Sequence, residues 1–108
     1  MKTIRLLKFK VDAQRITKDP TCDFTNIIAN TVGYLKAEFS FSTEWNDCHK
    51  IVSFWRGSKE YALLLNDECI CSIPSEVLNG RTFGVSVIGK KKDYRITTNK
   101  TTVRQEVN

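Results

Sequence analysis

The fold is decided by residues 34–42, which read Tyr-Leu-Lys-Ala-Glu-Phe-Ser-Phe-Ser. From Leu35 to Ser42, apolar and polar side chains alternate without a break. Period-two alternation is typical of a β-strand with one buried and one solvated face, as in antiparallel sheets. The stretch therefore predicts a sheet that packs one face on a core. Its inward positions are Leu35, Ala37, Phe39 and Phe41.

Shorter segments of the same kind occur on both sides of this stretch. Pro74 favours one helical turn over residues 74–78. The nearly continuous apolar content of residues 60–65 predicts a central strand, and polar residues 11–22 are expected to form a loop. Turn residues separate most of the remaining segments. We expect further strands at residues 2–10, 24–29, 50–55, 60–65, 69–73, 82–88, 94–98 and 102–107.

About eight strands with turn signals between them indicate an all-β fold. We predict one domain over residues 1–108, an antiparallel β-sandwich of jelly-roll or immunoglobulin-like type. It should have about seven to nine strands and at most one short helical turn. Beyond the positions named above, the expected core contains Trp45, Val52, Phe54, Leu63, Leu65, Ile73, Phe83, Val85, Val87 and Ile96.

The length of 108 residues fits one domain. The longest uninterrupted apolar run covers residues 62–65, far below the roughly 20 residues that span a bilayer. The first ten residues carry charges throughout, which is not the pattern of a signal peptide. We therefore expect no membrane association and synthesis in a reducing cytoplasm, where thiols stay free.

The formal net charge of +5 is unevenly distributed. Residues 1–19 carry six basic and two acidic groups, residues 20–80 carry four and eight, and residues 81–108 carry seven and two. Basic ends around an acidic middle can attract polyanions, or can simply form an uneven solvated surface. The second interpretation is favoured, because neither basic end shows the interleaved aromatic residues of a nucleic-acid platform.

The cysteines do not have the spacing of a metal site. Cys69 and Cys71 are separated by one residue, whereas paired zinc ligands usually have two to four residues between them. Both are expected on one face of a strand as small buried hydrophobic residues. Cys48 and His49 are adjacent, which is poor geometry for two ligands of one ion. We expect no metal and no cofactor.

Residues suited to catalysis do not form a coherent set in the sequence. His49 is the only histidine, and its neighbour Cys48 would point to the opposite face of a strand. Glycine-rich phosphate loops are not found. The carboxylates near expected turns have the ordinary interpretation of solvated surface groups; they are Glu44, Asp47, Asp67, Glu68 and Glu76. We therefore expect no enzymatic activity.

Two places are candidate binding sites. Trp55 alternates opposite to Phe54 and precedes Arg56, so it can lie on the outer face as part of a binding patch, or serve as a core anchor. Lys90, Lys91 and Lys92 form the densest charge run. They could touch phosphate or an acidic protein, or keep a hairpin tip soluble and unpaired, and the second interpretation is favoured. Trp45 is expected to close one end of the core, with its N–H on a turn carbonyl.

A series of motifs runs through residues 30–107. It consists of an aromatic strand with a Ser/acid-Trp turn, strands bearing Phe and Tyr, a Cys-x-Ile-Pro-x-Glu-Val-Leu element, a Phe-x-Val-Ser-Val-x-Gly strand and an Arg-Ile-Thr-Thr-Asn strand. In this sequence these are residues 34–45, 51–54, 61–65, 71–78, 83–89 and 95–99. The series resembles small structural proteins of bacteriophages and prophages of Gram-positive hosts, of the tail, baseplate or fibre N-terminal type.

The resemblance implies a β-sandwich that opens a longer virion protein, whereas this chain ends at Asn108. It favours a non-enzymatic module that acts through protein–protein contacts, with itself or with another phage or host protein. The alternative is a phage-encoded inhibitor of a host defence nuclease, of anti-CRISPR type, that binds through charged surfaces. A nucleic-acid partner is compatible but not favoured. The expected location is the host cytoplasm, or the assembled virion.

Overall fold

The computed structural model describes residues 3–107 and has an all-β fold. Nine strands and two single-turn 3-10 helices are found in this range. The strands are β1 Arg5–Asp12, β2 Arg15–Lys18, β3 Leu35–Phe41, β4 His49–Arg56, β5 Lys59–Leu64, β6 Ile70–Ser72, β7 Thr82–Lys91, β8 Tyr94–Thr97 and β9 Thr101–Arg104; the 3-10 turns are η1 Thr43–Trp45 and η2 Ser75–Val77. The predicted sandwich class is confirmed.

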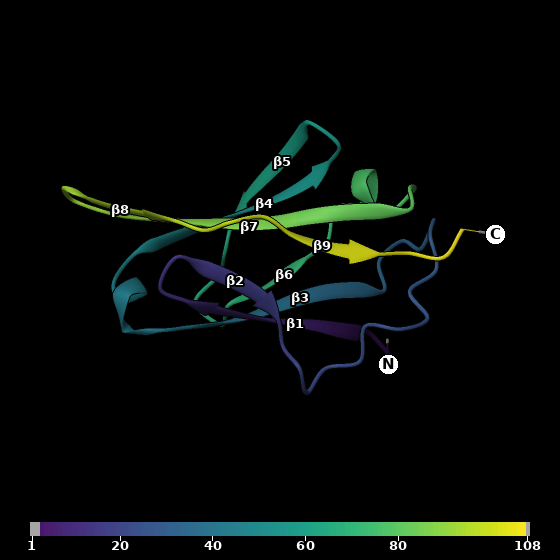
Figure 1. The fold of residues 1–108 in the computed structure, drawn as a ribbon, viewed down its shortest axis with the longest axis horizontal. Coiled ribbons are helices and arrows are strands. Elements are labelled where there is room, and N and C mark those ends of the chain that lie inside the picture. The colour runs from purple at the N-terminus through teal and green to yellow at the C-terminus, as the bar shows by residue number, and fades with distance from the viewer. Residues whose placement is uncertain (1–2, 108) are drawn as a thin grey trace.

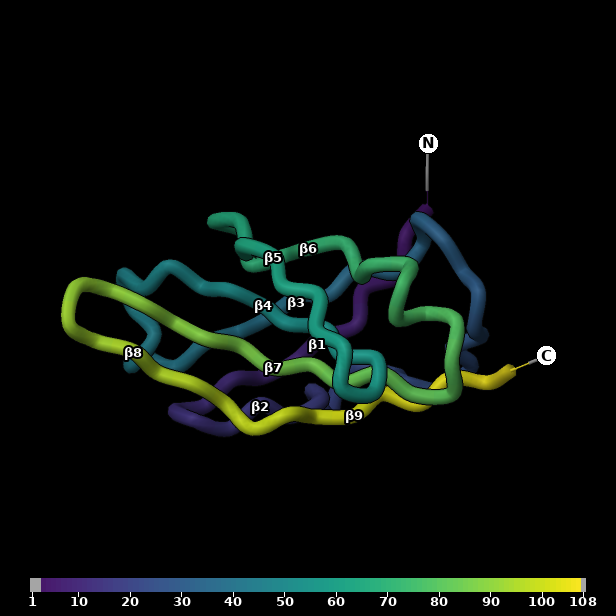
Figure 2. Tube along the Cα trace, turned by 90° about the horizontal axis from the view of Figure 1, so that it is seen from above, coloured from purple at the N-terminus to yellow at the C-terminus, as the bar shows by residue number. Residues whose placement is uncertain are grey.

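The strands form two stacked sheets (Figures 1 and 2). One sheet has the order β2-β1-β3-β6, and the other has the order β5-β4-β7-β8, with β9 also paired to β7. The pairs are antiparallel except for β1 with β3, which run parallel from Arg5 beside Leu35 to Val11 beside Phe41. A parallel pair needs a long crossover, and residues 13–34 supply it.

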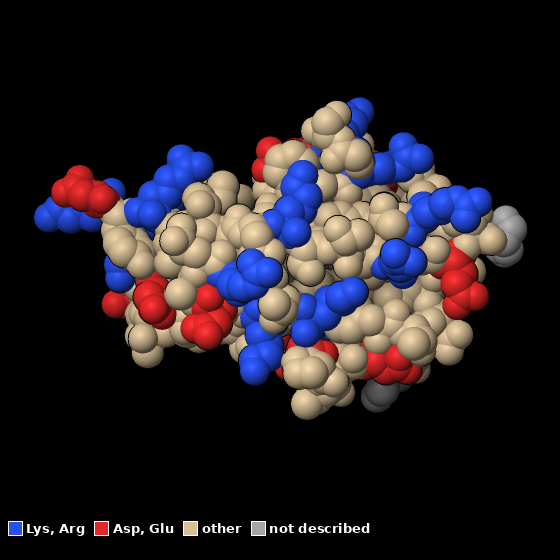
Figure 3. All heavy atoms as spheres, viewed as in Figure 1, with Lys and Arg blue, Asp and Glu red and all other residues tan. Residues whose placement is uncertain are grey.

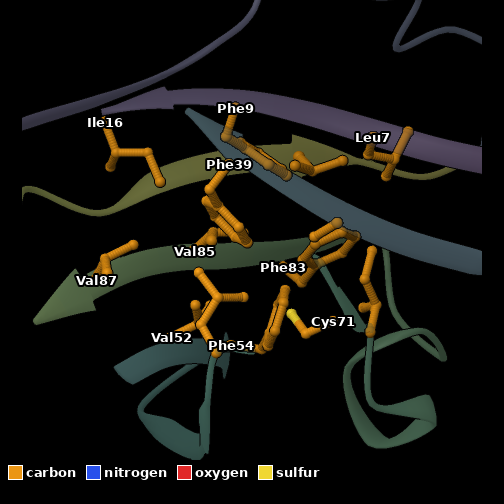
Figure 4. Packing of buried hydrophobic residues seen from close by; sticks show 14 of the residues in the cluster. Leu7, Phe9, Ile16, Phe39, Val52, Phe54, Cys71, Phe83, Val85 and Val87 are labelled. Carbon is orange, nitrogen blue, oxygen red and sulfur yellow. The ribbon is translucent and has the colours of Figure 1, made fainter. Parts of the chain in front are cut away.

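The core lies between the two sheets and is rich in phenylalanine (Figure 4). The rings of Phe9 and Phe39 stack at a centroid distance of 5.3 Å, on neighbouring strands of one sheet. Phe54 and Phe83 face them from the other sheet, with centroids 6.4 Å apart. Every residue predicted to form the core is buried except Phe41 and Leu63, which are half-buried.

Residues 11–29 differ from their prediction. The expected loop contains β2, because Ile16 is completely buried and anchors that strand to the core. The strand expected at residues 24–29 is not formed; the segment makes only an isolated parallel bridge between Ile28 and Glu106. Ile27 and Ala29 are nevertheless buried. The apolar residues of this segment therefore correctly indicated contact with the core, but they did not indicate a strand.

The strand predicted to be central is an edge strand instead. β5 pairs only with β4 in the described part of the chain, and Leu64 is 66% exposed. Its apolar run was misleading because Leu64 belongs to the outward-facing set, beside Ile51. A second 3-10 turn, η1, precedes β4, so residues 3–107 contain two short helical turns rather than at most one.

The two sheets are joined along one side by Asn99, in the connection between β8 and β9. Its Oδ1 accepts the backbone N–H of Ile16 at 2.8 Å, and its Nδ2 donates to the Ile16 carbonyl at 3.3 Å. The backbone N–H of Asn99 donates to Gln14 at 3.3 Å. An asparagine side chain can donate and accept at once, so this residue pairs with edge strand β2 as a further strand would.

Trp45 closes one end of the core, as predicted. It is completely buried, and its Nε1–H donates to the carbonyl of Ala13, in the β1–β2 turn, at 2.8 Å. Gly89 in β7 provides the space for its ring: a Cβ at this position would lie 2.7 Å from Trp45 Cε3.

No helix among residues 3–107 has the length and apolar character needed to cross a lipid bilayer.

The contact between Gly89 and Trp45 makes a stability prediction. Gly89→Ala should lower the free energy of unfolding by about 1–3 kcal/mol, because the added methyl group overpacks a completely buried ring. Gly80→Ala is the matched control, since its Cβ would approach nothing closer than Arg56 Nε, a flexible side-chain atom, at 3.5 Å. Urea unfolding of both variants measures the difference. Equal stability of the two variants would contradict the packing described here.

Candidate functional site

Trp55 and Arg56 lie near the outer face of the five-stranded sheet. Trp55 is half-buried, and its Nε1–H donates to Ser86 Oγ at 2.9 Å. The Lys100 ammonium lies 3.7 Å from the centroid of the indole ring, so this aromatic face already has a cation over it. Arg56 is exposed at the β4–β5 turn.

The three consecutive lysines have different environments. Lys91 is half-buried, donates to the Asn46 carbonyl at 2.8 Å and lies 4.9 Å from the Tyr94 ring centroid. The Tyr94 hydroxyl in turn donates to the Glu44 carbonyl at 2.9 Å. These contacts hold the β7–β8 hairpin against η1. Lys90 and Lys92 are exposed.

The structure does not bring these candidate residues together. Lys90 is the cross-strand partner of His49, whereas Trp55 is paired with Gly84. His49 and Trp55 are six positions apart on β4, which corresponds to about 20 Å along a strand. The tryptophan position and the lysine run are therefore two separate places on the surface.

Cys48 and His49 both line a hollow of about 200 Å³, together with Asp67 and Cys69. The described residues nevertheless contain no group of three or more His, Cys, Asp or Glu side chains arranged to hold a metal ion. Cys71 is buried, as predicted, but Cys69 precedes β6 in a left-handed turn conformation with φ of 62° and is only half-buried. The carboxylates predicted at turns are all exposed: Glu44, Asp47, Asp67, Glu68 and Glu76.

A surface that the sequence patterns did not reveal lies at the end of the sandwich where both chain ends are found. Backbone hydrogen bonds join the segments there: Arg5 donates to Tyr34 at 2.8 Å, and Ala29 donates to Glu106 at 2.8 Å. Figures 1 and 2 show the two termini at the same end of the sandwich. We call this surface the apolar end, after its exposed apolar side chains: Ile4 38%, Ile28 39%, Val32 75%, Tyr34 42% and Val107 47%.

Arg5 holds the irregular segment that leads to the apolar end. Its guanidinium donates to the backbone carbonyls of Asp23, Thr25 and Asn26, at 3.0, 2.6 and 3.0 Å. Asp23 Oδ1 also accepts from both the N–H and the hydroxyl of Thr25, and these bonds lower the pKa of the Asp23 carboxyl. Asp19 accepts from Thr21 in the same way. The loop is thus fixed by hydrogen bonds rather than by strand pairing.

The sequence contains a signal for the apolar end. Val32 and Tyr34 flank Gly33, which has φ of 74°. Apolar residues beside a glycine turn, outside any alternating run, are candidates for an exposed cluster. That Ile4 and Val107 join them depends on the tertiary fold and has no local signal.

Cys71 gives a prediction that depends on pH. Burial raises the pKa of its thiol from 9.0 to about 12, so at pH 9 only about one molecule in a thousand carries the thiolate. Iodoacetamide should therefore label Cys71 at least about 100-fold more slowly than the half-buried Cys48, as measured by peptide mass spectrometry. In urea both should react. Since the unfolded thiol ionises near pH 9 and the folded thiol does not, stability should also fall above that pH.

Labelling of Cys71 in the native protein at the rate of Cys48 would contradict this burial.

Comparisons with protein-family models, with curated proteins and with solved structures give no match for this chain. What supports a function is therefore the surface geometry described above.

Proposed function

We propose that the protein is a non-enzymatic interaction module of a bacteriophage or prophage, which docks another protein through its apolar end. The observation that carries this proposal is the concentration of exposed apolar side chains at one end of the sandwich. Five of the seven large hydrophobic residues that are exposed in the described range lie there. Contiguous exposed apolar surface on a stable domain is typical of a protein-binding site.

The apolar end has the physical properties of a pre-organised docking surface. Val32 alone is 75% exposed, and complete burial of a side chain of this size contributes about 1.5–3 kcal/mol. The loop around it is held on both sides by backbone hydrogen bonds, from Asn30 to the Leu78 carbonyl at 2.6 Å and from Arg5 to the Tyr34 carbonyl at 2.8 Å. Little ordering entropy would then be lost on binding, which favours affinity.

The partner that we propose is another protein of the phage particle. The resemblance over residues 30–107 supports this choice, and three residues of the apolar end, Val32, Tyr34 and Val107, fall within that range. In the proteins that the chain resembles, the module connects to further virion domains. In this chain, the apolar end lies beside both termini, where such a connection would be made.

Inhibition of a host defence nuclease is the second candidate function. The observation that favours it is that few positive charges are paired with an acidic side chain in the described residues. The residues that the structure describes contain one ion pair, Lys8–Glu38 at 3.9 Å, while the sequence has 17 lysines and arginines. Cations without local partners are available to a complementary acidic surface.

Fractionation of phage particles tests the proposed function. The tagged chain is expressed during prophage induction, and the amount in purified particles is measured by quantitative mass spectrometry. We expect the wild-type chain to be found with the particles, and Val32→Ser combined with Tyr34→Ser to reduce its amount about tenfold or more. This corresponds to about 1.4 kcal/mol or more of lost binding energy.

Leu64→Ser is the matched control, because Leu64 is 66% exposed but lies on the far edge strand β5. It should remain with the particles. The docking proposal fails if all three chains behave alike. Recovery of the wild-type chain with a host nuclease, and not with particles, would support the inhibitor instead.

A further inference from the structure

We propose that the protein also binds the sugar–phosphate backbone of a nucleic acid, along a basic seam where β2 and β9 run side by side. The basic seam consists of Arg15 and Lys18 from β2, Lys100 from the connection before β9, and Arg104 from β9. All four side chains are exposed. None of them belongs to the apolar end, so this proposal stands independently of the proposed docking function.

The fold creates the seam by joining the two basic ends of the chain. Arg15 and Lys18 belong to the segment 1–19, and Lys100 and Arg104 belong to the segment 81–108. Asn99 binds the backbone of Ile16 on both sides, and β2 contacts β9 although they belong to different sheets. Figure 3 shows Lys and Arg side chains gathered over this junction, with acidic groups mainly toward the margins of the same face.

Within the part of the chain that the structure describes, the charges of the seam have no ion-pair partners. The single ion pair found among residues 3–107, Lys8–Glu38, lies off the seam. Asp12 is the cross-strand partner of Arg15, but the two side chains do not form an ion pair. The guanidinium groups of Arg15 and Arg104 also make no hydrogen bond within the described residues. Both are therefore available to an external anion.

The two lysines of the seam are held in place by aromatic rings. The Lys18 ammonium lies 5.8 Å from the Phe24 ring centroid, and that of Lys100 lies 3.7 Å from the Trp55 centroid. Gly84 makes room for the Lys100 stem, since a Cβ there would lie 2.8 Å from Lys100 Cδ. A cation over an aromatic ring is attracted by its negative face. These ammonium groups thus lose less freedom when they bind an anion.

We expect the seam to take a line of phosphates rather than an acidic protein patch. Lys100 and Arg104 are four positions apart along nearly extended chain, or about 13 Å, so they share a face, and Arg15 and Lys18 lie on the two sides of the neighbouring edge strand β2. Duplex DNA presents one negative charge per roughly 1.7 Å of its axis. The face of Trp55 is covered by Lys100 and leaves no free platform for base stacking. We therefore expect duplex binding through phosphates, without base readout.

The test compares two variants that remove two positive charges each. The seam variant is Arg15→Gln with Arg104→Gln. The control is Lys36→Gln with Lys59→Gln, which also takes one residue from each sheet but lies off the seam. Thermal unfolding confirms that both fold. Binding to a fluorescently labelled 24-base-pair DNA duplex is then measured by anisotropy at several salt concentrations.

We expect wild-type affinity to fall steeply with salt. The seam variant should lose at least about tenfold in affinity near 0.1 M salt, and its log–log salt slope should decrease by about two. The control should keep the wild-type slope to within about half a unit. The proposal is overturned if the wild type does not bind DNA, if both variants lose affinity equally, or if poly-L-glutamate competes as well as DNA at equal charge.

Discussion

The side chain of Asn99 joins the two sheets, and the positions of the charged surface groups depend on this junction. A β-sandwich of this size has open edges, and an unpaired edge strand exposes backbone groups that must find partners. β2 has only one fully buried side chain, Ile16, whose N–H and carbonyl are both bonded to Asn99. The junction thus provides hydrogen-bond partners for backbone groups of the edge strand β2 and places this strand beside β9.

Two different surfaces follow from the same architecture. The parallel pairing of β1 with β3 requires a crossover, and its irregular part reaches the end of the sandwich where the termini lie. There it exposes Val32 and Tyr34. The side closed by Asn99 instead gathers cations from both chain ends. An apolar surface suits a protein partner and a basic one suits a polyanion, and the two surfaces share no residue.

Alternation made much of the fold predictable, because one buried face imposes period two on a strand. β3, β4 and β7 and nearly all core positions were found in this way. β2 was missed because Ile16 is the only buried residue among its four, so the strand shows no alternation of apolar and polar residues. The edge position of β5 was missed because apolar content does not show which face is covered. The sequence showed two basic ends, but no local signal places Arg15 near Arg104.

Hydrogen exchange at the Ile16 amide tests the junction most directly, because this N–H is bonded to Asn99 Oδ1 at 2.8 Å. The structure predicts slow exchange in the wild-type protein and fast exchange in Asn99→Ala, while the amide of Val85, in the middle of the five-stranded sheet, stays protected in both. Fast exchange of Ile16 in the wild type, or protection that survives the substitution, would contradict the joining of the two sheets at this point.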